Sequence, residues 1–395
     1  MKGSPVEVFI TFLRLGLTSF GGPIAHLGYF RRELIEKREW FSEAQYAQLL
    51  AICQFLPGPA SSQLGFTLGL IRAGWAGALA AFVAFTLPSA VLLVVFAALM
   101  PGLSGTIGNA VLHGLELVAL SVVAHGVLGM SRNLCLDIPR GVIAVAVIVV
   151  VVATGAAWVQ ILVVALAALA GLALPIVTEP ESKTPLAVNV PRRTGALLLV
   201  IFGVLLIGLP LLARAGGGPL SVMEAFYCPG ALVFGGGHVV LPLLEETVVA
   251  PGWVSRDQFL SGYGAAQAVP GPMFSFAAYL GTILPGHTGG ISGAVIALLS
   301  IFLPGFLLVS GALPLWGAIS SRPAAARAIA GINAAVVGFL GAALYDPIWV
   351  SAVRGLLDVV IAGVGFALLS WRKMSAIFVV LWCIVASVLF ALATS

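Results

Sequence analysis

The segment "AICQFLPGPASSQLGF", residues 51–66, places Pro57-Gly58-Pro59 inside a stretch that is otherwise apolar enough to lie in a membrane. The segment "GAAQAVPGPMFSFAAY", residues 264–279, repeats the pattern of a glutamine, two further residues and Pro-Gly-Pro, 213 positions later. Proline removes a backbone donor, and an unpaired backbone group within a bilayer costs several kcal/mol. Two helix breaks at matching positions therefore indicate that the broken backbone lines a cavity and does not face lipid.

The composition indicates a protein that crosses a membrane many times. Hydrophobic residues make up 60% of the chain and charged residues only 9%, whereas about 25% charged is usual in soluble domains. Thirteen apolar runs approach the roughly 20 residues that a helix needs to cross the hydrocarbon core. These runs lie at about 8–30, 44–70, 74–99, 107–130, 139–155, 158–177, 195–214, 221–244, 257–284, 288–313, 325–346, 355–371 and 374–393.

The sequence gives no support to several other protein classes. It contains no Gly-x-x-x-x-Gly-Lys-Ser/Thr phosphate loop, so nothing indicates that ATP drives the protein. The four cysteines (Cys53, Cys135, Cys228 and Cys383) stand in different segments, so we interpret them as apolar core residues and expect no metal and no cofactor. An intramembrane enzyme that acts on lipid is disfavoured, because the chain has no His-Glu-x-x-His motif and no paired intramembrane aspartates. We expect that the protein is not an enzyme.

The two halves of the chain are internal repeats. The residues "FGGP" at 20–23 match "FGGG" at 234–237, and "WFS" at 40–42 matches "WVS" at 253–255. In inverted-topology transporters an unpaired helix between the halves turns the second repeat upside down, and we predict the same relation here. The predicted divisions are a first transmembrane repeat at 1–177, a polar cytoplasmic linker at 178–194, a connecting transmembrane helix at 195–220 and a second, inverted transmembrane repeat at 221–395.

The distribution of basic residues predicts which segments cross the membrane. If all thirteen crossed, the basic cluster at 31–38 and the arginines near the central linker would lie on opposite sides, which violates the positive-inside rule. If the first two segments of each repeat enter and leave on the same side, fifteen of the nineteen basic residues face the cytoplasm. We therefore predict an all-α polytopic membrane protein with nine full spans and two re-entrant pairs, whose broken helices meet near the bilayer midplane. Thirteen full spans are the alternative.

Each break follows a short helix whose start is marked in the sequence. Ser42 with Gln45, and Ser255 with Gln258, fit the Ser-x-x-Gln capping box. A helix from Ser42 to about Phe55 covers only about 20 Å at 1.5 Å per residue, which is too short to cross the bilayer. After Pro-Gly-Pro a second half-helix begins, and its unpaired N–H groups and positive dipole end form a site for an anion.

We expect the two breaks to contribute to anion binding near the midplane. Gln54 and Gln267 close the first half-helices, where their amides could donate across each break. Arg14 is the one basic residue that the preferred topology leaves within the membrane, where it could neutralise an anion. The predicted substrate-binding residues are Arg14, Ser19, Phe20, Gly21, Gly22, Gln54, Pro57, Gly58, Pro59, Ser61, Ser62, Gln63, Gly235, Gly236, Gln267, Gly271 and Ser275.

Ionisable residues within the apolar segments are candidates for proton coupling. His113 and Glu116 share a helix face because they are three positions apart. His26 and His238 adjoin the two glycine runs, and Glu224 stands near the start of the eighth apolar run. A proton relay is one interpretation of these residues, and a satisfied structural pair is the other.

Four stretches of the first half together resemble a known family: "TSFGGPIAHLGYF" at 18–30, "REWFSEAQY" at 38–46, "QFLPGPASSQ" at 54–63 and "RAGWAGALAAFVAFTLP" at 72–88. Over essentially its whole length the chain is similar to the chromate ion transporter family in its long two-domain form. The resemblance implies export of chromate from the bacterial cytoplasm, driven by the membrane potential or a proton gradient, and hence chromate resistance. It puts these residues on the family's characteristic positions: Ser19, Phe20, Gly21, Gly22, Pro23, His26, Trp40, Gln54, Pro57, Gly58, Pro59 and Gln63.

The second repeat departs from this pattern, with Gly237 for Pro23 and Phe276 for Gln63, so we do not expect two chemically equal sites. The residues by themselves favour a tetrahedral oxyanion without choosing between chromate and sulfate. A sulfate or oxyanion channel and an uptake carrier are the alternatives to an exporter. The expected partners are chromate or sulfate-like anions and membrane lipid, with a homodimer as one option and no nucleic acid. The expected location is the bacterial inner membrane.

Overall fold

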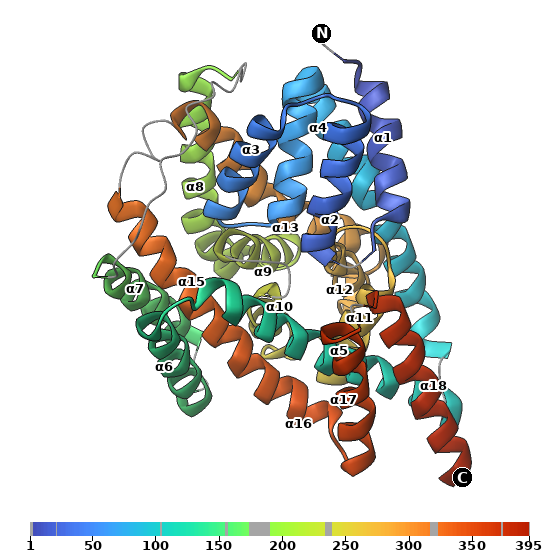
Figure 1. Ribbon diagram of the computed structural model, residues 1–395. Helices are drawn as coiled ribbons and strands as arrows, with labels where there is room; N and C mark the ends of the chain where they lie inside the picture. Colours follow the sequence, from blue (N-terminus) through green and yellow to red (C-terminus); the bar gives the residue numbers. More distant parts are fainter. Residues whose placement is uncertain are drawn as a thin grey trace. The chain divides into compact units, whose positions relative to one another are not determined.

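Every regular element is a helix in the part of the chain that the computed structural model describes (Figure 1), which confirms the predicted all-α class. That part comprises residues 3–20, 22–102, 105–154, 157–173, 190–233, 239–316, 323–372 and 374–394. In the first half the helices are α1 (Pro5–Thr18), α2 (Gly22–Phe30), η1 (Arg31–Lys37), α3 (Glu43–Phe55), α4 (Ala60–Leu99), η2 (Met100–Gly102), α5 (Gly105–Leu134), α6 (Ile138–Thr154) and α7 (Ala157–Leu172). In the second half they are α8 (Arg192–Gly216), α9 (Pro219–Leu232), α10 (Val240–Leu244), η4 (Glu245–Val249), α11 (Arg256–Ala268), η5 (Met273–Ser275), α12 (Phe276–Ile283), η6 (Gly286–Thr288), α13 (Gly290–Ala312), η7 (Leu313–Leu315), α15 (Pro323–Ala343), η8 (Leu344–Trp349), α16 (Val350–Ala352), α17 (Leu356–Ser370) and α18 (Ala376–Thr394).

The helices gather into two compact units, and each unit takes segments from both halves of the sequence. Unit 1 consists of Met1–Leu92, Val177–Val240 and Pro270–Pro323, and unit 2 consists of Leu93–Ile176, Leu241–Val269 and Ala324–Ser395. The compact units are therefore not the repeats. The predicted divisions at 1–177 and 221–395 describe internal repetition, and they remain a prediction.

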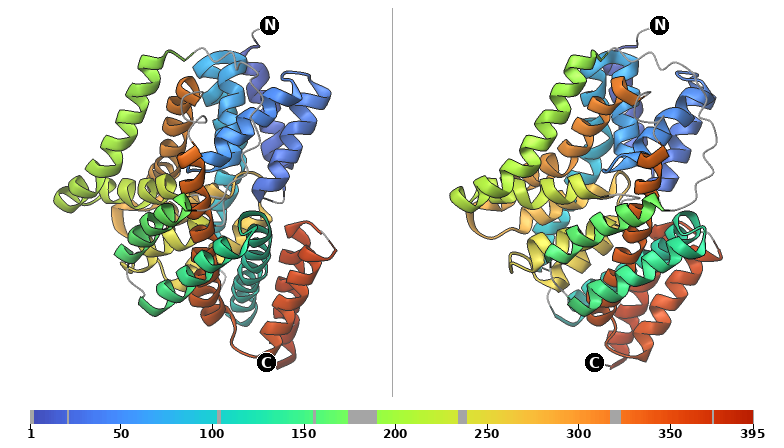
Figure 2. Two further views of the ribbon diagram at one scale, coloured as in Figure 1. Left: turned by 60° about the vertical axis from the view of Figure 1, so that its left-hand side comes forward. Right: turned by 90° about the vertical axis from the view of Figure 1, so that its left-hand side faces the viewer.

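Unit 1 is built around α13, which contacts α8, α9 and α12. Gly230 of α9 permits a close approach, because a Cβ at this position would collide with the backbone oxygen of Ile301 on α13. Both views of Figure 2 show α8 meeting α9 at a sharp turn. The turn contains Gly217 and Gly218, whose φ angles of 60° and 57° favour glycine.

An aromatic cluster joins the first helices of unit 1 to α4. The rings of Phe30 and Phe85 lie 5.1 Å apart, and Phe12 lies 5.5 Å from Phe30, in edge-on geometries that aromatic pairs prefer. All three side chains are almost completely buried. The cluster therefore fixes α1, α2 and α4 against one another, and this position also holds His26, whose ring lies 5.3 Å from Phe85.

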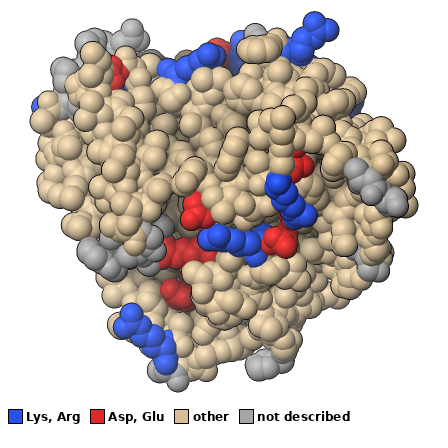
Figure 3. All heavy atoms as spheres, turned by 90° about the horizontal axis from the view of Figure 1, so that it is seen from below, with Lys and Arg blue, Asp and Glu red and all other residues tan. Residues whose placement is uncertain are grey.

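Unit 2 is built around α5, which contacts α11, α17 and α18. A Cβ at Gly264 would collide with the backbone of Leu115, and one at Gly114 would approach Ile384 to 2.8 Å, so small residues permit both contacts. Unit 2 also contains several ion pairs, including one between Arg256 and Glu245 at 3.4 Å. On the face drawn in Figure 3, acidic and basic atoms gather in a hollow surrounded by uncharged atoms.

Six helices of the described residues are long and apolar enough to cross a membrane. They are Ala60–Gly102, Gly105–Arg132, Arg192–Arg214, Gly290–Leu315, Arg327–Ala352 and Ala376–Ala393. Large apolar side chains such as Ile10, Leu197 and Leu389 are exposed on these and neighbouring helices, as lipid-facing side chains are. The chain is a multi-pass membrane protein, and the full number of spans and the re-entrant pairs stay a prediction.

The predicted short helices are confirmed. Ser42 and Gln45 bond reciprocally as a capping box at the start of α3, which ends at Phe55 after 13 residues. Ser255 and Gln258 do the same at the start of α11, which also has 13 residues. Both helices stop at Pro-Gly-Pro, as expected for a proline that cannot continue the helix.

The two halves also repeat each other in backbone structure. The π-helical segments η1 and η4 start 214 positions apart, at Arg31 and Glu245. Each is followed by the same backbone hydrogen bond, from Trp40 to Leu34 at 2.8 Å and from Val254 to Val248 at 3.0 Å. The repeats that the sequence predicts are thus present in the fold.

Candidate anion site at the helix breaks

The two Pro-Gly-Pro breaks are tied reciprocally to the two repeats. The N–H of Gly58 donates to the carbonyl of Val233 at 2.7 Å, and the N–H of Gly271 donates to the carbonyl of Ser19 at 3.0 Å. Ser19 and Val233 hold the same place in their repeats, directly before Phe-Gly-Gly. Each break therefore bonds to the residue that precedes Phe-Gly-Gly in the other repeat. Within unit 1 the two contacts are thus related to each other as the two halves of a two-fold symmetric contact are.

Glycine is required at both breaks because of the backbone conformation. The φ angle is 125° at Gly58 and 106° at Gly271, which residues with a side chain rarely adopt. A Cβ on Gly58 would also lie 3.1 Å from the Cα of Gly305, and one on Gly271 would lie 3.2 Å from the carbonyl of Phe85. The backbones of the two repeats approach each other closely as a result.

The side chains beside the breaks also contact the other repeat, with different chemistry in each case. Gln63 Nε2 donates to Pro57 O at 2.9 Å and to Gly305 O at 3.0 Å. Two carbonyl partners fix the orientation of this amide, so Gln63 holds the break together and its Nε2 is not free for an anion.

At the second break the corresponding contact joins two hydroxyl groups. Ser89 Oγ donates to Thr86 O at 2.9 Å and lies 2.7 Å from Ser275 Oγ. A serine hydroxyl has one hydrogen, so Ser275 must donate to Ser89. At the second break, the hydroxyl hydrogen of Ser275 is therefore not free to bind an anion.

Four buried polar atoms near the first break and Ser19 have no partner among the described residues. They are Ser19 Oγ, His26 Nε2, Ser62 Oγ and Gln63 Oε1, on residues that are at most 5% exposed. Buried polar groups are normally hydrogen-bonded, and leaving one unpaired costs about 1–3 kcal/mol. The two hydroxyl groups among these atoms, of Ser19 and Ser62, are therefore candidates for contact with a polar ligand.

His26 connects the parts of this site. Its Nδ1 lies 3.5 Å from Ser61 Oγ in the first turn of α4, and the histidine also hydrogen-bonds to the backbone of Ser19. The first intrahelical bond of α4 runs from Gln63 N to Pro59 O. The N–H groups of the three residues before Gln63 consequently have no acceptor within the helix. The site combines neutral side-chain donors with a helix N-terminus, which suits an anion.

Of the predicted residues, the structure brings His26 together with Ser19 and Ser61, and Ser62 and Gln63 follow Ser61 in the first turn of α4. The remaining predicted residues of unit 1 at the breaks are backbone or packing positions: Phe20, Gly22, Pro57, Gly58, Pro59, Gly271 and Ser275. Four predicted residues lie outside the described part of the chain: Gly21, Gly235, Gly236 and His238.

Arg14 and Gln54 are exposed side chains, outside the group of buried polar residues, and their role in binding is untested. Arg14 is exposed, because α1 turns Phe12 and Leu15 toward the core and Arg14 lies on another face of the helix. The side chain of Gln54 is exposed near the end of α3. Its counterpart Gln267 is buried and hydrogen-bonds with Tyr263 inside unit 2.

The proton-coupling candidates separate into different places. His26 belongs to the site just described, and Glu224 is half-buried on α9, where it interacts electrostatically with Arg214. His113 and Glu116 lie in unit 2, 3.2 Å apart, so the predicted shared helix face is confirmed.

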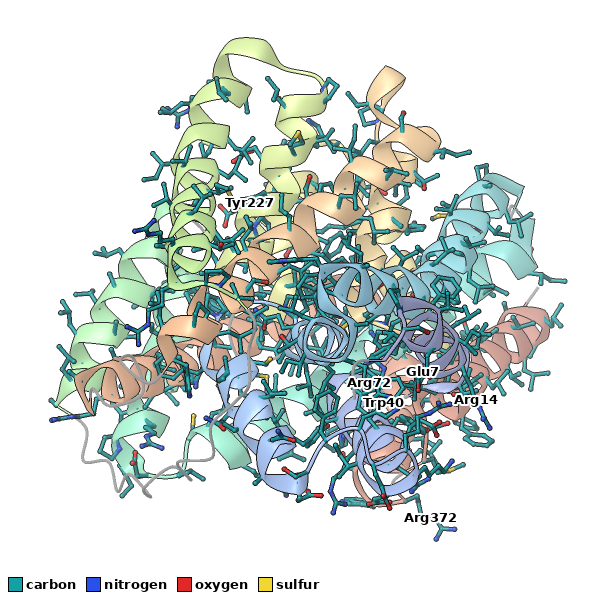
Figure 4. The ribbon with its side chains drawn as sticks, turned by 90° about the horizontal axis from the view of Figure 1, so that it is seen from above. Glu7, Arg14, Trp40, Arg72, Tyr227 and Arg372 are labelled. Atoms are coloured by element: carbon teal, nitrogen blue, oxygen red, sulfur yellow. The ribbon has the colours of Figure 1, made fainter. Side chains whose placement is uncertain are left out.

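Arg72 has a structural role that the sequence pattern alone did not reveal. Its Nη2 lies 3.3 Å from Glu7 Oε2, and its guanidinium lies 4.8 Å from the centre of the Trp40 ring. Figure 4 shows these three side chains gathered between α1 and α4. Arg72 stands directly before Ala73 and Gly74, whose backbone interrupts α4. The "RAGW" motif was the signal, since an arginine between two apolar runs needs a partner.

Comparisons with known proteins agree with the fold. The model of the chromate transporter family matches residues 6–172 and 220–388, one match in each half. The chain is 29% identical over 359 residues to a probable chromate transport protein of Synechococcus elongatus, covering 84% of this chain and 82% of that protein. It is 27% identical over 354 residues to the chromate transport protein of Pseudomonas aeruginosa, covering 86% and 80%. No solved structure matches. The chain belongs to the chromate transporter family.

Proposed function

We propose that this protein is a secondary transporter that exports chromate from the cytoplasm across the bacterial inner membrane, driven by the membrane potential or a proton gradient. The observation that carries the proposal is the pair of buried hydroxyl groups of Ser19 and Ser62, which have no partner among the described residues, beside the start of α4. The family match and the relatives named for chromate transport support the choice of substrate.

The proposed site binds an oxyanion weakly enough to release it. Hydrogen bonds from neutral donors to a charged group contribute about 1.5–3 kcal/mol each. A helix N-terminus adds about half a positive charge. Conduction requires that binding be favourable for entry but weak enough for exit, and neutral donors without a permanent cation fit this requirement.

The second break acts as a structural counterpart of the site. Ser275 donates its hydroxyl hydrogen to Ser89, and the neighbouring residues Phe274 and Phe276 are buried. This chemistry offers an anion neither a free hydroxyl nor an amide. We therefore assign one oxyanion site to each chain, at the first break.

Counterflow in proteoliposomes tests the proposal. Vesicles that contain the purified protein are loaded with unlabelled chromate, and entry of labelled chromate or sulfate is measured. We expect Ser62→Ala to reduce chromate exchange roughly tenfold or more, because a donor to a charged ligand is lost. Ser121→Ala is the matched control, since Ser121 is buried in unit 2 and its hydroxyl lies 2.9 Å from Leu117 O and 3.0 Å from Ala362 O. Equal exchange in both variants and the parent would move the site elsewhere.

A passive oxyanion channel is the second candidate, because neutral donors also suit fast permeation. Reversal potentials distinguish the two. A channel follows the anion gradient alone, whereas a coupled carrier also responds to the driving ion. An uptake carrier would give the opposite direction of net flux in vesicles of known orientation.

A further inference from the structure

A second cluster of ionisable side chains lies in unit 2, within the spanning helix α5. His113 Nδ1 is 3.2 Å from Glu116 Oε2, and His113 Nε2 is 2.9 Å from Asp358 Oδ1 on α17. The Glu116 side chain is only 2% exposed. Both ring nitrogens of one histidine thus face a carboxylate.

Both carboxylates are held in place by further donors. Arg354 Nη2 donates to Glu116 Oε2 at 3.1 Å. Asp358 Oδ2 accepts from the backbone N–H groups of Arg354 and Gly355, at 2.9 and 3.0 Å, as it caps the start of α17. Neither carboxylate can therefore turn away from His113 without loss of another hydrogen bond.

The geometry requires an extra proton. A neutral imidazole has one N–H and one lone pair, so it can donate to only one of the two carboxylates. With His113 protonated, both contacts are hydrogen bonds, and the charges of Glu116, Asp358, Arg354 and His113 sum to zero. Without the proton, a lone pair faces a carboxylate and the cluster has one net negative charge within the membrane.

Among the described residues, Arg354 is the basic side chain that contacts this cluster. α11 contributes Ser261, whose hydroxyl donates to Leu112 O at 3.3 Å, and α18 contributes Cys383 beside Gly114. η8 contributes Asp346, which pairs with Arg256 at 3.3 Å. The arginine of the cluster also reaches water, since the Arg354 side chain is 58% exposed.

We propose that the cluster of His113, Glu116, Asp358 and Arg354 is the proton-binding site that couples the proton gradient to oxyanion transport. This proposal rests on the proposed function, and it chooses the proton as the driving ion. The bound proton is shared between His113 and its two carboxylates, and it exchanges with water beside Arg354. Loss of this proton leaves the cluster with one uncompensated negative charge in the membrane. The transport cycle must either keep the proton bound or use its release.

The test separates coupling from substrate exchange. Proteoliposomes with a clamped membrane potential are given a lumen about one pH unit more acidic than the medium, and chromate accumulation is compared with chromate counterflow. One coupled proton per chromate supports up to about tenfold accumulation in the parent. We expect His113→Gln to abolish this accumulation while it retains counterflow within about twofold of the parent.

His125→Gln is the matched control. His125 also lies on α5 and bonds to α17, but its Nδ1 faces the hydroxyl of Ser370 at 3.0 Å, where no extra proton is required. This variant should accumulate chromate as the parent does. If His113→Gln does not fold, Asp358→Asn takes its place, with the same expected loss.

Three results would overturn the inference. One is proton-driven accumulation by His113→Gln or Asp358→Asn at the parental level. Another is a parallel loss of accumulation and counterflow, which would indicate a structural role. The third is a parent that exchanges chromate but ignores the pH gradient. In that last case the proposed function would survive, whereas absence of counterflow in the parent would count against the proposed function itself.

Discussion

Gly58 and Gly271 hold the same place in the two repeats, and the N–H of each donates to a carbonyl of the opposite repeat, Val233 O at 2.7 Å and Ser19 O at 3.0 Å. These bonds satisfy backbone donors at the points where the helices are interrupted. An unpaired donor at membrane depth would cost several kcal/mol. The reciprocal contact thus explains how this chain tolerates two Pro-Gly-Pro breaks: each repeat supplies the acceptor that the other one lacks.

We predict that Gly58→Ala destabilises the protein and impairs transport. The φ angle of 125° costs a residue with a side chain about 1–3 kcal/mol. The new Cβ would also lie 2.7 Å from Gln63 Nε2 and 3.1 Å from Gly305 Cα. Thermal unfolding in detergent should show a lower midpoint. Gly203→Ala is the control, because a Cβ there meets nothing within 4 Å, and equal midpoints in the two variants would contradict the strain argument.

A comparison of Arg72 with Arg14 tests which arginine matters to the fold. The Glu7 partner is 35% exposed, so after allowance for solvent screening the ion pair contributes at most about 1 kcal/mol. The contact with Trp40 adds about 0.5–1 kcal/mol. We expect Arg72→Gln to lower stability by about 1–2 kcal/mol. Arg14→Gln should resemble the parent in stability and in chromate flux, and a large loss of flux would return Arg14 to the site.

Local signals in the sequence were sufficient for the helix boundaries. The capping boxes at Ser42 and Ser255 and the prolines after Phe55 specify the start and end of short helices through contacts between near neighbours. The internal repeat then identified the second break from the first. These helix ends are stabilised by contacts between residues close in the sequence, so the local sequence is enough to predict them.

Contacts between distant residues could not be predicted in the same way. Arg14 was expected in the site because the predicted topology leaves it within the membrane. The packing of Phe12 and Leu15, however, decides which face of α1 is buried. Asp358 joins His113 across 245 positions, and no spacing rule connects them. The partners of buried polar groups depend on tertiary packing, which the pattern of a single helix does not contain.

We predict that the two repeats face opposite sides of the membrane. In a background without the four native cysteines, cysteine replaces Lys37, and in a second variant it replaces Ala250; both residues are exposed beside the matching segments η1 and η4. An impermeant maleimide should label Lys37→Cys only from the cytoplasmic side and Ala250→Cys only from the opposite side. Labelling of both from one side would refute the inverted arrangement.

The last prediction concerns pH. Burial raises the pKa of Glu245 to about 7, against the opposing effect of Arg256. Below about pH 4.5 the folded and unfolded states both hold the proton. Between there and about pH 7 the unfolded chain has released it while the folded protein retains it, so stability falls as pH rises. Above that range the loss is complete, on the order of 1–3 kcal/mol.

Glu245→Gln removes this titration and leaves Arg256 its contact with Asp346 at 3.3 Å. The variant should therefore have a smaller decrease in its unfolding midpoint than the parent when the pH is raised from about 5 to 8. Glu39→Gln serves as the control, because Glu39 is exposed and its replacement should leave the parental pH profile unchanged. If Glu245→Gln and the parent lose stability in parallel over this range, the Glu245 carboxyl is already ionised at low pH and burial does not control its proton.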